Sequence, residues 1–356
     1  MPVTTEPFGT TPAGEPVDRC VLDDGAGVTV ALLTYGATVQ AVHAPGRHGT
    51  TANVALGFAD LDGYLKDTTD PDGSAYLGAT VGRYANRIGG AAFELDGTRY
   101  ELPADPDGNL LHGGPGALHT KVWQAELPDP DAAVVRLSTV SSDGEQGFPG
   151  TLTVAVTFRL TGTELSIQFE ATTDAPTVVN LTNHTYWNLA GEGSGDVLDH
   201  IAQVAAERYV PVDEAMIPLG ELAPVEGTPL DLRADTVLGT RVREGHEQLV
   251  RARGLDFTYV IDGEPGTLRE AAAIADPSSG RTLTLSTTEP GVQLYTGNFL
   301  DGSLVGTSGR MYRMGDGLAL EPQHLPDSPN QPAFPTTVLR PGETLRSTSV
   351  YAFGVI

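Results

Sequence analysis

Residues 152–160 read LTVAVTFRL and residues 164–170 read ELSIQFE, and these two stretches decide the fold class. In both, apolar residues largely alternate with polar ones, which is typical of β-strands that bury one side. The same alternation recurs in residues 281–287 (RTLTLST) and 347–353 (STSVYAF). Clusters rich in Gly, Pro and Asp, such as residues 262–266, separate these stretches and predict tight turns.

Helix signals are few in this sequence. The best candidate runs from about Asp235 to Glu247, but Gly239 and Gly245 interrupt it. The pattern therefore predicts a mainly β protein built as a large antiparallel β-sandwich. No low-complexity segment or break in composition divides the chain, so we expect residues 1–356 to form a single domain.

Composition excludes several classes of protein. The chain of 356 residues has 21 Lys and Arg against 46 Asp and Glu, a formal net charge of −25. Such a charge repels phosphate backbones and anionic lipids, so we expect neither nucleic acid nor a membrane as a partner. Residues 1–14 lack the cationic and apolar regions of a secretory signal, which predicts a cytoplasmic protein. The single cysteine, Cys20, allows no internal disulfide.

The segment NLTNHTYWNL, residues 180–189, is unusually polar for a strand and carries one imidazole. If the segment is extended, Asn180, Thr182 and His184 share one face, because side chains alternate along a strand. A polar inner face indicates a ligand cleft. A buried histidine held by neighbouring Asn and Thr side chains explains the pattern equally well.

Two glycine-containing segments hold further candidates for ligand binding. His112 lies in NLLHGG (109–114), where two glycines permit a sharp turn or a close approach to a ligand. Asn86 and Arg87 lie together in GRYANRI (82–88), and a guanidinium suits hydroxyl or carboxylate oxygens. An incidental turn histidine and a structural salt bridge are the alternatives.

Two acids and one amide occupy apolar strand-like segments. Glu321 lies in LALEPQ (318–323) and Asp256 in GLDFT (254–258). Burial raises the pKa of a lone carboxyl and makes it a usable base, although a structural role stays open for both acids. Gln293 begins QLYTGN, whose alternating amide, aromatic and small polar residues suit a sugar-facing strand or an ordinary strand end.

The histidines give no sign of a metal site. None of the eight is three or four residues from another, the spacing of the helical metal motifs. We therefore predict no metal.

Six motifs with candidate functional residues follow one another along the chain. They are GRYANRI (82–88), NLLHGG (109–114), NLTNHTYWNL (180–189), GLDF (254–257), QLYTGN (293–298) and LEPQHLPDSPNQPAFP (320–335). Taken together they resemble the aldose 1-epimerase family, also called galactose mutarotases. The likeness extends from about residue 20 to the end of the chain. It implies the galactose mutarotase-like supersandwich, with a sugar cleft across one face.

The resemblance also implies roles for the candidate residues. Glu321 is implied to be the general base and His184 the general acid. The implied substrate-binding residues, which contact sugar hydroxyls and the ring oxygen, are His112, Arg87, Asn86, Asp256 and Gln293. Mutarotation needs one base on the C1 hydroxyl and one acid on the ring oxygen, so no cofactor is implied. The implied partner is a small aldose such as glucose or galactose, and the implied assembly is a monomer or a homodimer.

Two departures from the family pattern concern aromatic positions. Phe257 stands where the family often has histidine, and Trp187 where phenylalanine is usual, so we expect sugar preference and cleft shape to depend on them. Three other functions remain as alternatives: a glycoside hydrolase using Glu321 and Asp256, an epimerase of modified or phosphorylated hexoses, and a non-catalytic sugar-binding module.

Overall fold

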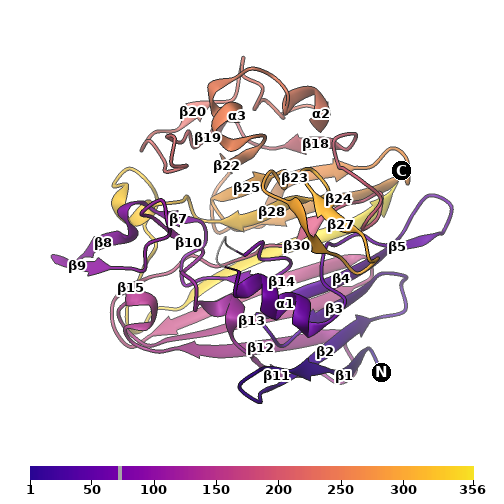
Figure 1. Ribbon diagram of the computed structural model, residues 1–356, viewed down its shortest axis with the longest axis horizontal. Coiled ribbons are helices and arrows are strands. Elements are labelled where there is room, and N and C mark those ends of the chain that lie inside the picture. The colour runs from indigo at the N-terminus through magenta and orange to yellow at the C-terminus, as the bar shows by residue number, and fades with distance from the viewer. Residues whose placement is uncertain (71–73) are drawn as a thin grey trace.

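The computed structural model describes residues 1–70 and 74–356, and strands dominate it (Figure 1). Its largest sheet is antiparallel throughout. The strand order is β11 (Gln124–Glu126), β12 (Val134–Ser141), β13 (Leu152–Thr161), β14 (Glu164–Thr173), β30 (Leu345–Val355), β24 (Arg281–Thr287), β23 (Arg269–Ala275), β18 (Ile201–Val204) and β21 (Thr236–Val237). The four strands predicted from alternation, β13, β14, β30 and β24, lie side by side in its centre.

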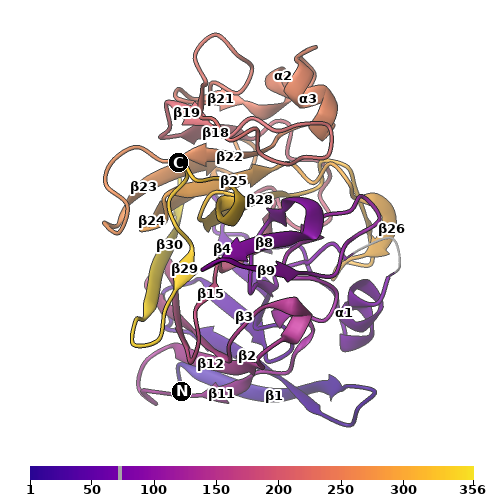
Figure 2. The ribbon, with the colours of Figure 1, turned by 90° about the vertical axis from the view of Figure 1, so that its left-hand side faces the viewer.

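Two further sheets complete the main architecture. A five-stranded sheet contains β1 (Val3–Thr10), β2 (Pro16–Asp23), β3 (Thr29–Leu33), β4 (Thr38–Pro45) and β5 (Thr51–Asn53). A six-stranded sheet runs in the order β17 (Tyr186–Trp187), β28 (Leu318–Gln323), β25 (Gly291–Tyr295), β22 (Asp256–Val260), β19 (Arg208–Tyr209) and β20 (Ala223–Pro224). In Figure 2, β1 and β2 lie at the bottom and β22, β25 and β28 lie above the middle.

Five short two-stranded ladders in the described residues lie outside these sheets. They pair β6 (Thr80–Val81) with β16 (Thr182–Asn183), β7 (Arg87–Ile88) with β10 (Leu110–Leu111), β8 (Ala92–Leu95) with β9 (Thr98–Glu101), β15 (Thr177–Val178) with β29 (Val338–Leu339), and β26 (Asp301–Val305) with β27 (Met311–Arg313). The ladders matter for function because β6, β7, β10 and β16 carry or flank candidate site residues.

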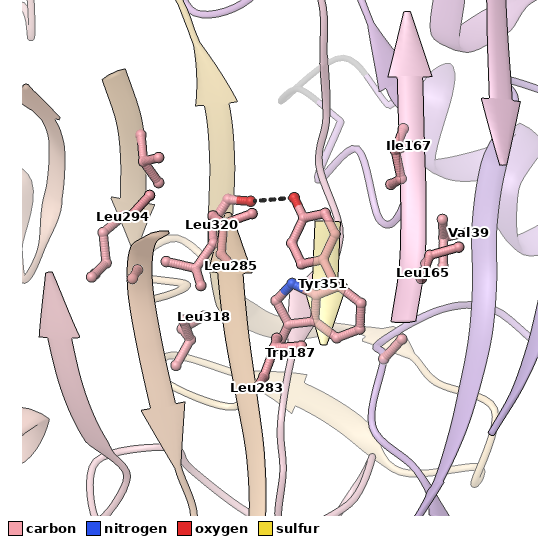
Figure 3. Packing of buried hydrophobic residues seen from close by; sticks show 14 of the residues in the cluster. Val39, Leu165, Ile167, Trp187, Leu283, Leu285, Leu294, Leu318, Leu320 and Tyr351 are labelled. Atoms are coloured by element: carbon pink, nitrogen blue, oxygen red, sulfur yellow. Dashed lines mark hydrogen bonds between the residues drawn. The ribbon is translucent and has the colours of Figure 1, made fainter. Parts of the chain in front are cut away.

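One buried core joins all three sheets (Figure 3). Leu165 of β14 and Leu283 of β24 come from the nine-stranded sheet, Leu320 of β28 from the six-stranded sheet, and Val39 of β4 from the five-stranded sheet. The Tyr351 hydroxyl of β30 donates a hydrogen bond to the Leu320 carbonyl at 3.0 Å, so this buried hydroxyl has a hydrogen-bond partner. The predicted mainly β class and large antiparallel sandwich are confirmed.

Helices are short in the described residues. They are α1 (Leu61–Thr68), α2 (Leu238–Arg241) and α3 (Glu247–Ala252), with single 3₁₀ turns at Gly89–Ala91, Leu118–Thr120, Glu145–Gly147 and Ser328–Asn330. The predicted helix from Asp235 to Glu247 is therefore wrong in extent. The chain leaves helical geometry after α2, and α3 begins anew behind His246, whose side chain accepts a hydrogen bond from the Gln248 amide.

Helix α1 has no counterpart among the predicted elements. It begins behind Asp60, whose carboxylate accepts a hydrogen bond from the Gly63 amide at 3.0 Å and caps the helix. Among the described residues, the helices are all too short or too polar to span a bilayer.

Candidate active site

The six-stranded sheet places three candidate residues on one face. Glu321 of β28 lies directly opposite Gln293 of β25, which lies directly opposite Thr258 of β22. Residues opposite each other on neighbouring strands project from the same face, and so does Asp256, two residues before Thr258. All four side chains are buried. Strand register therefore brings Glu321, Gln293 and Asp256 together from three distant segments.

The other face of the same sheet belongs to the core. Phe257, between Asp256 and Thr258, is fully buried and packs edge-on against Tyr209 with ring centroids 6.0 Å apart. Trp187 packs on Tyr351 of the nine-stranded sheet at 5.4 Å, as Figure 3 shows. Both departures from the family pattern are thus core positions, and any influence on sugar preference passes through core packing.

His184 reaches Glu321 because its segment is broken into short pieces rather than forming one strand. Strand β16 ends at Asn183, and β17 begins at Tyr186 and pairs with β28. Between them, the His184 amide donates a hydrogen bond to the Ala79 carbonyl at 2.8 Å. Its Nε2 lies 3.6 Å from Oε1 of Glu321, and both side chains are at most 5% exposed. The segment therefore supplies an imidazole to the carboxylate on the sheet.

His112 is held by the segment that carries Asn86. The His112 amide donates to the Asn86 carbonyl at 3.0 Å, and the Asn86 amide donates back to Nδ1 of His112 at 3.1 Å. Because Nδ1 accepts a hydrogen bond, the neutral ring carries its proton on Nε2 and offers a donor there. The His112 and His184 ring centroids are 5.1 Å apart.

Gly113 explains how the two segments approach so closely. Its φ is +84°, and a Cβ added there would lie 2.3 Å from the Gly82 carbonyl oxygen. Only glycine fits such a position without displacing the backbone. The turn behind His112 thus needs Gly113, as the sequence suggested.

Arg87 and Arg83 have different roles. Arg83 donates to Oγ of Ser141 at 2.8 Å and to backbone carbonyls nearby, so it is a structural residue. Arg87 makes no salt bridge within the described residues. Together with Asn86, Asp256 and Gln293 it lines a small pocket. The rest of the pocket wall is Thr258 and the apolar side chains of Val210, Val212, Met216 and Pro326.

Burial dominates the electrostatics of the acid and the imidazole. It raises the pKa of Glu321 well above its ordinary value; Asp256 adds to this shift and Arg87 opposes it. Burial also lowers the pKa of His184 to about 4. Both shifts act in the same sense and favour the uncharged forms, a protonated Glu321 and a neutral His184. An adjacent protonated carboxyl and neutral imidazole hold the same number of protons as a carboxylate and an imidazolium.

His112 is electrostatically similar to His184. Its pKa is lowered well below the ordinary value by burial, and by the neighbouring His184 and Arg87. His112 therefore acts as an uncharged hydrogen-bond donor near neutral pH.

The three groups His112, His184 and Glu321 also deserve a test as metal ligands. One potential ligand atom from each lies within 4.8 Å of the others. However, Nδ1 of His112 already accepts the Asn86 amide, and the proton on Nε2 blocks the lone pair that a metal would need. The cluster suits hydrogen bonding to a ligand better than metal binding. The absence of a metal site stays a prediction.

Sequence reasoning missed Tyr76 and Thr258. The Tyr76 ring lies 4.6 Å from the His112 ring and 5.9 Å from the His184 ring, nearly parallel to the latter. No motif pointed to Tyr76, because its contacts depend on a φ of +55° and on residues far along the chain. Thr258 was accessible in principle, since it lies two residues after Asp256 and therefore on the same face of a strand.

Comparison with known proteins shows the family to which the chain belongs. A family model described as aldose 1-epimerase matches residues 18–352. The chain is 42% identical to galactose mutarotase of Rattus norvegicus, covering 99% of each chain. It is 37% identical to aldose 1-epimerase of Escherichia coli (strain K12), covering 96% of each. The solved structure of galactose 1-epimerase from Lactobacillus acidophilus NCFM superposes with a TM-score of 0.85 at 27% identity, covering 99% of this chain and 98% of that one.

Proposed function

The chain belongs to the aldose 1-epimerase family, and from this premise we propose that it interconverts the α and β anomers of free aldoses. The observation that carries the proposal is the buried pair of Glu321 and His184, with Nε2 and Oε1 3.6 Å apart beside a polar sheet face. Mutarotation needs one acid and one base, and Glu321 and His184 provide both without a cofactor.

The proposed reaction opens and recloses the sugar ring. Glu321, as carboxylate, removes the proton from the C1 hydroxyl while His184, as imidazolium, protonates the ring oxygen. The C1–ring oxygen bond breaks, and C1 becomes an aldehyde. After rotation about C1–C2, the ring oxygen attacks the other face of the aldehyde, and both protons return. The two groups exchange roles on the return, so an acid and a base that share a proton suit the cycle.

The remaining candidates bind the sugar in this proposal. Nε2–H of His112 donates a hydrogen bond to a sugar oxygen, because its tautomer is set by the Asn86 amide. Arg87 donates in a planar fork to hydroxyl oxygens, and Asp256 accepts from a hydroxyl. The apolar wall around Val210 and Met216 excludes water from one side of the pocket.

The alternatives fit the residues less well. A hexose phosphate calls for several cations, whereas the pocket wall contains one arginine, Arg87. A non-catalytic binding module has no use for an adjacent carboxyl and imidazole, yet Glu321 and His184 are both present. One core cluster that draws on all three sheets supports the proposal of a single domain.

Polarimetry tests the proposed function directly. Freshly dissolved α-D-galactose and α-D-glucose are followed with and without catalytic amounts of the protein, after correction for mutarotation catalysed by buffer. We expect a faster approach to the same final rotation, and the two rates rank the sugars. No acceleration with either sugar, nor with aldopentoses, would overturn the proposal; a calorimetric titration would then test for binding alone.

A further inference from the structure

Thr258 lies on the same face of the six-stranded sheet as Glu321, Gln293 and Asp256. It is not among the candidate residues predicted from the sequence. It stands directly opposite Gln293 in the ladder between β22 and β25. Both side chains are buried, with 2% and 3% of their surface exposed. The Thr258 hydroxyl donates a hydrogen bond to Oε1 of Gln293. At its other end, Nε2 of Gln293 donates to Oδ1 of Asp256 at 2.6 Å.

These two hydrogen bonds hold the carboxamide of Gln293 at both ends. A carboxamide has one acceptor oxygen and two N–H donors, and the carboxylate of Asp256 only accepts. A rotated amide would turn its oxygen toward the carboxylate, which is unfavourable. The Thr258 hydroxyl satisfies the buried oxygen in the observed orientation, so the amide has no reason to turn.

The two hydrogen bonds of the Gln293 carboxamide leave one donor and one acceptor for a ligand. No hydrogen bond within the described part of the chain engages the second N–H of Gln293 or Oδ2 of Asp256. Since both residues line the same small pocket, they offer a donor and an acceptor side by side. Two neighbouring sugar hydroxyls match such a pair, because one accepts while the other donates.

We propose that Thr258 is a positioning residue for substrate binding, which orients the Gln293 amide so that Gln293 and Asp256 together bind two adjacent hydroxyls of the aldose. The inference rests on the proposed function, since it concerns the same site. Thr258 does not touch the reacting atoms, so it acts on binding rather than on the proton transfers of Glu321 and His184.

Thr258→Val tests the proposal, because valine keeps the shape and removes the hydroxyl. We expect KM for D-galactose to rise about tenfold and kcat to stay within about twofold of wild type, the signature of lost ground-state and transition-state binding alike. Thr258→Ser restores the hydroxyl and is expected to bring KM back to within about twofold of wild type. The assignment would be overturned if KM is unchanged in Thr258→Val, or if kcat falls about tenfold while KM stays at the wild-type value.

A double-mutant cycle asks whether Thr258 acts through Gln293. In a Gln293→Ala background, we expect Thr258→Val to change KM by less than about twofold, because the group that it orients is gone. Independent effects that multiply would contradict the proposal.

A buried threonine elsewhere gives the matched control. Thr287 of β24 is fully buried, and its hydroxyl pairs with that of Ser349 at 2.9 Å. Thr287→Val removes a buried hydroxyl without touching the site, so it is expected to lower the melting temperature and leave KM unchanged. A raised KM in Thr287→Val would mean that general loosening explains the Thr258 result.

Failure of this inference is distinguishable from failure of the proposed function. The wild-type protein alone decides whether mutarotation is catalysed, while the ratio between Thr258→Val and wild type decides the role of Thr258. Calorimetric titration with D-galactose at anomeric equilibrium measures that ratio as dissociation constants, because no net conversion then takes place. Equal dissociation constants for wild type, Thr258→Val and Thr258→Ser would refute the inference even if the protein is a mutarotase.

Discussion

Glu321 and His184 lie side by side in a place where neither charge is well solvated. Burial raises the pKa of the carboxyl and lowers that of the imidazole, so the uncharged forms of both groups are favoured. In the proposed mechanism, sugar oxygens supply these two groups with the hydrogen bonds that water supplies to exposed groups. The same desolvation that disfavours the charges at rest makes the carboxylate a stronger base once it forms.

Replacing the base tests the core of the mechanism. Glu321→Gln keeps the size of the side chain and removes its ability to take a proton. We expect kcat to fall by at least about a hundredfold, because a positioned base contributes about 10²- to 10⁴-fold. Polarimetry on α-D-galactose measures the loss, and an unchanged circular dichroism spectrum shows that the fold persists. Turnover close to that of wild type would remove Glu321 from the mechanism.

Removing the binding arginine is expected to have the complementary effect. Arg87 lines the pocket and makes no hydrogen bond or salt bridge to Glu321 or His184 in the described residues, although its charge lowers the pKa of Glu321. Arg87→Ala is therefore expected to raise KM about tenfold and to change kcat much less. The same polarimetric assay at varied sugar concentration separates the two constants. Arg253→Ala, on the surface beside Phe299, serves as control. A large fall in kcat with unchanged KM would show that the two roles are exchanged.

The pH profile of kcat/KM follows from the shared proton. The active pair carries one proton, so activity is lost on the acid side only when the neutral His184 also becomes protonated, at a pKa of about 4. On the alkaline side, activity falls as the pair loses its proton at the raised pKa of Glu321. We therefore expect nearly full kcat/KM at pH 5.5. An acid limb centred near the ordinary pKa of histidine, about 6.5, would contradict this assignment.

At the scale of elements, the sequence predicts the long strands with regular apolar–polar alternation and fails to predict the shortest elements. Strands β13 and β24 were predictable because a period of two repeats several times in each. Strands β16 and β17, which flank His184, contain two residues each, too few to show any period. Helix α1 escaped prediction because it is only eight residues long and contains a glycine.

The candidate site was predictable residue by residue, but its geometry was not. Resemblance of motifs singled out Glu321 and His184, yet their closeness depends on β17 pairing with β28. The tautomer of His112 depends on a backbone amide 26 residues away, at Asn86. Tyr76 gains its position through backbone shape, and the pairing of Thr258 with Gln293 depends on strand register. Such long-range pairings leave no local pattern in the sequence.

Core packing at the element scale gives a prediction about Trp187 of β17. Its indole is 1% exposed and packs on Tyr351 and Phe353 of β30. Trp187→Phe leaves a void between the two sheets, so we expect a loss of about 1–3 kcal/mol in the free energy of unfolding with little change in KM. Urea denaturation measures the loss, and Val250→Ala at an exposed site is the control. A KM shift as large as that expected for Arg87→Ala would mean that Trp187 controls the cleft through packing.

At the scale of the whole molecule, the excess of acid is the dominant electrostatic feature. The formal net charge is −25, and most salt bridges in the described residues include at least one exposed side chain. Exposed pairs of this kind contribute little to stability. Repulsion among the excess carboxylates therefore has a larger effect on stability than these salt bridges. The repulsion is stronger in the compact folded state than in the expanded unfolded state, so it destabilises the fold.

Screening this repulsion is expected to stabilise the protein. Raising NaCl from about 0.02 to about 0.5 M shortens the Debye length from about 20 to about 4 Å, so the melting temperature at pH 7.5 should rise by several degrees. At pH 4.5, near the isoelectric point of about 4.5, the same salt step is expected to have almost no effect. Because free aldoses carry no charge, KM should not respond to salt at either pH. An equal rise in melting temperature at both pH values would trace the effect to general salting-out rather than to charge, and a KM that climbs with salt would mean that a charged group of the ligand contributes to binding.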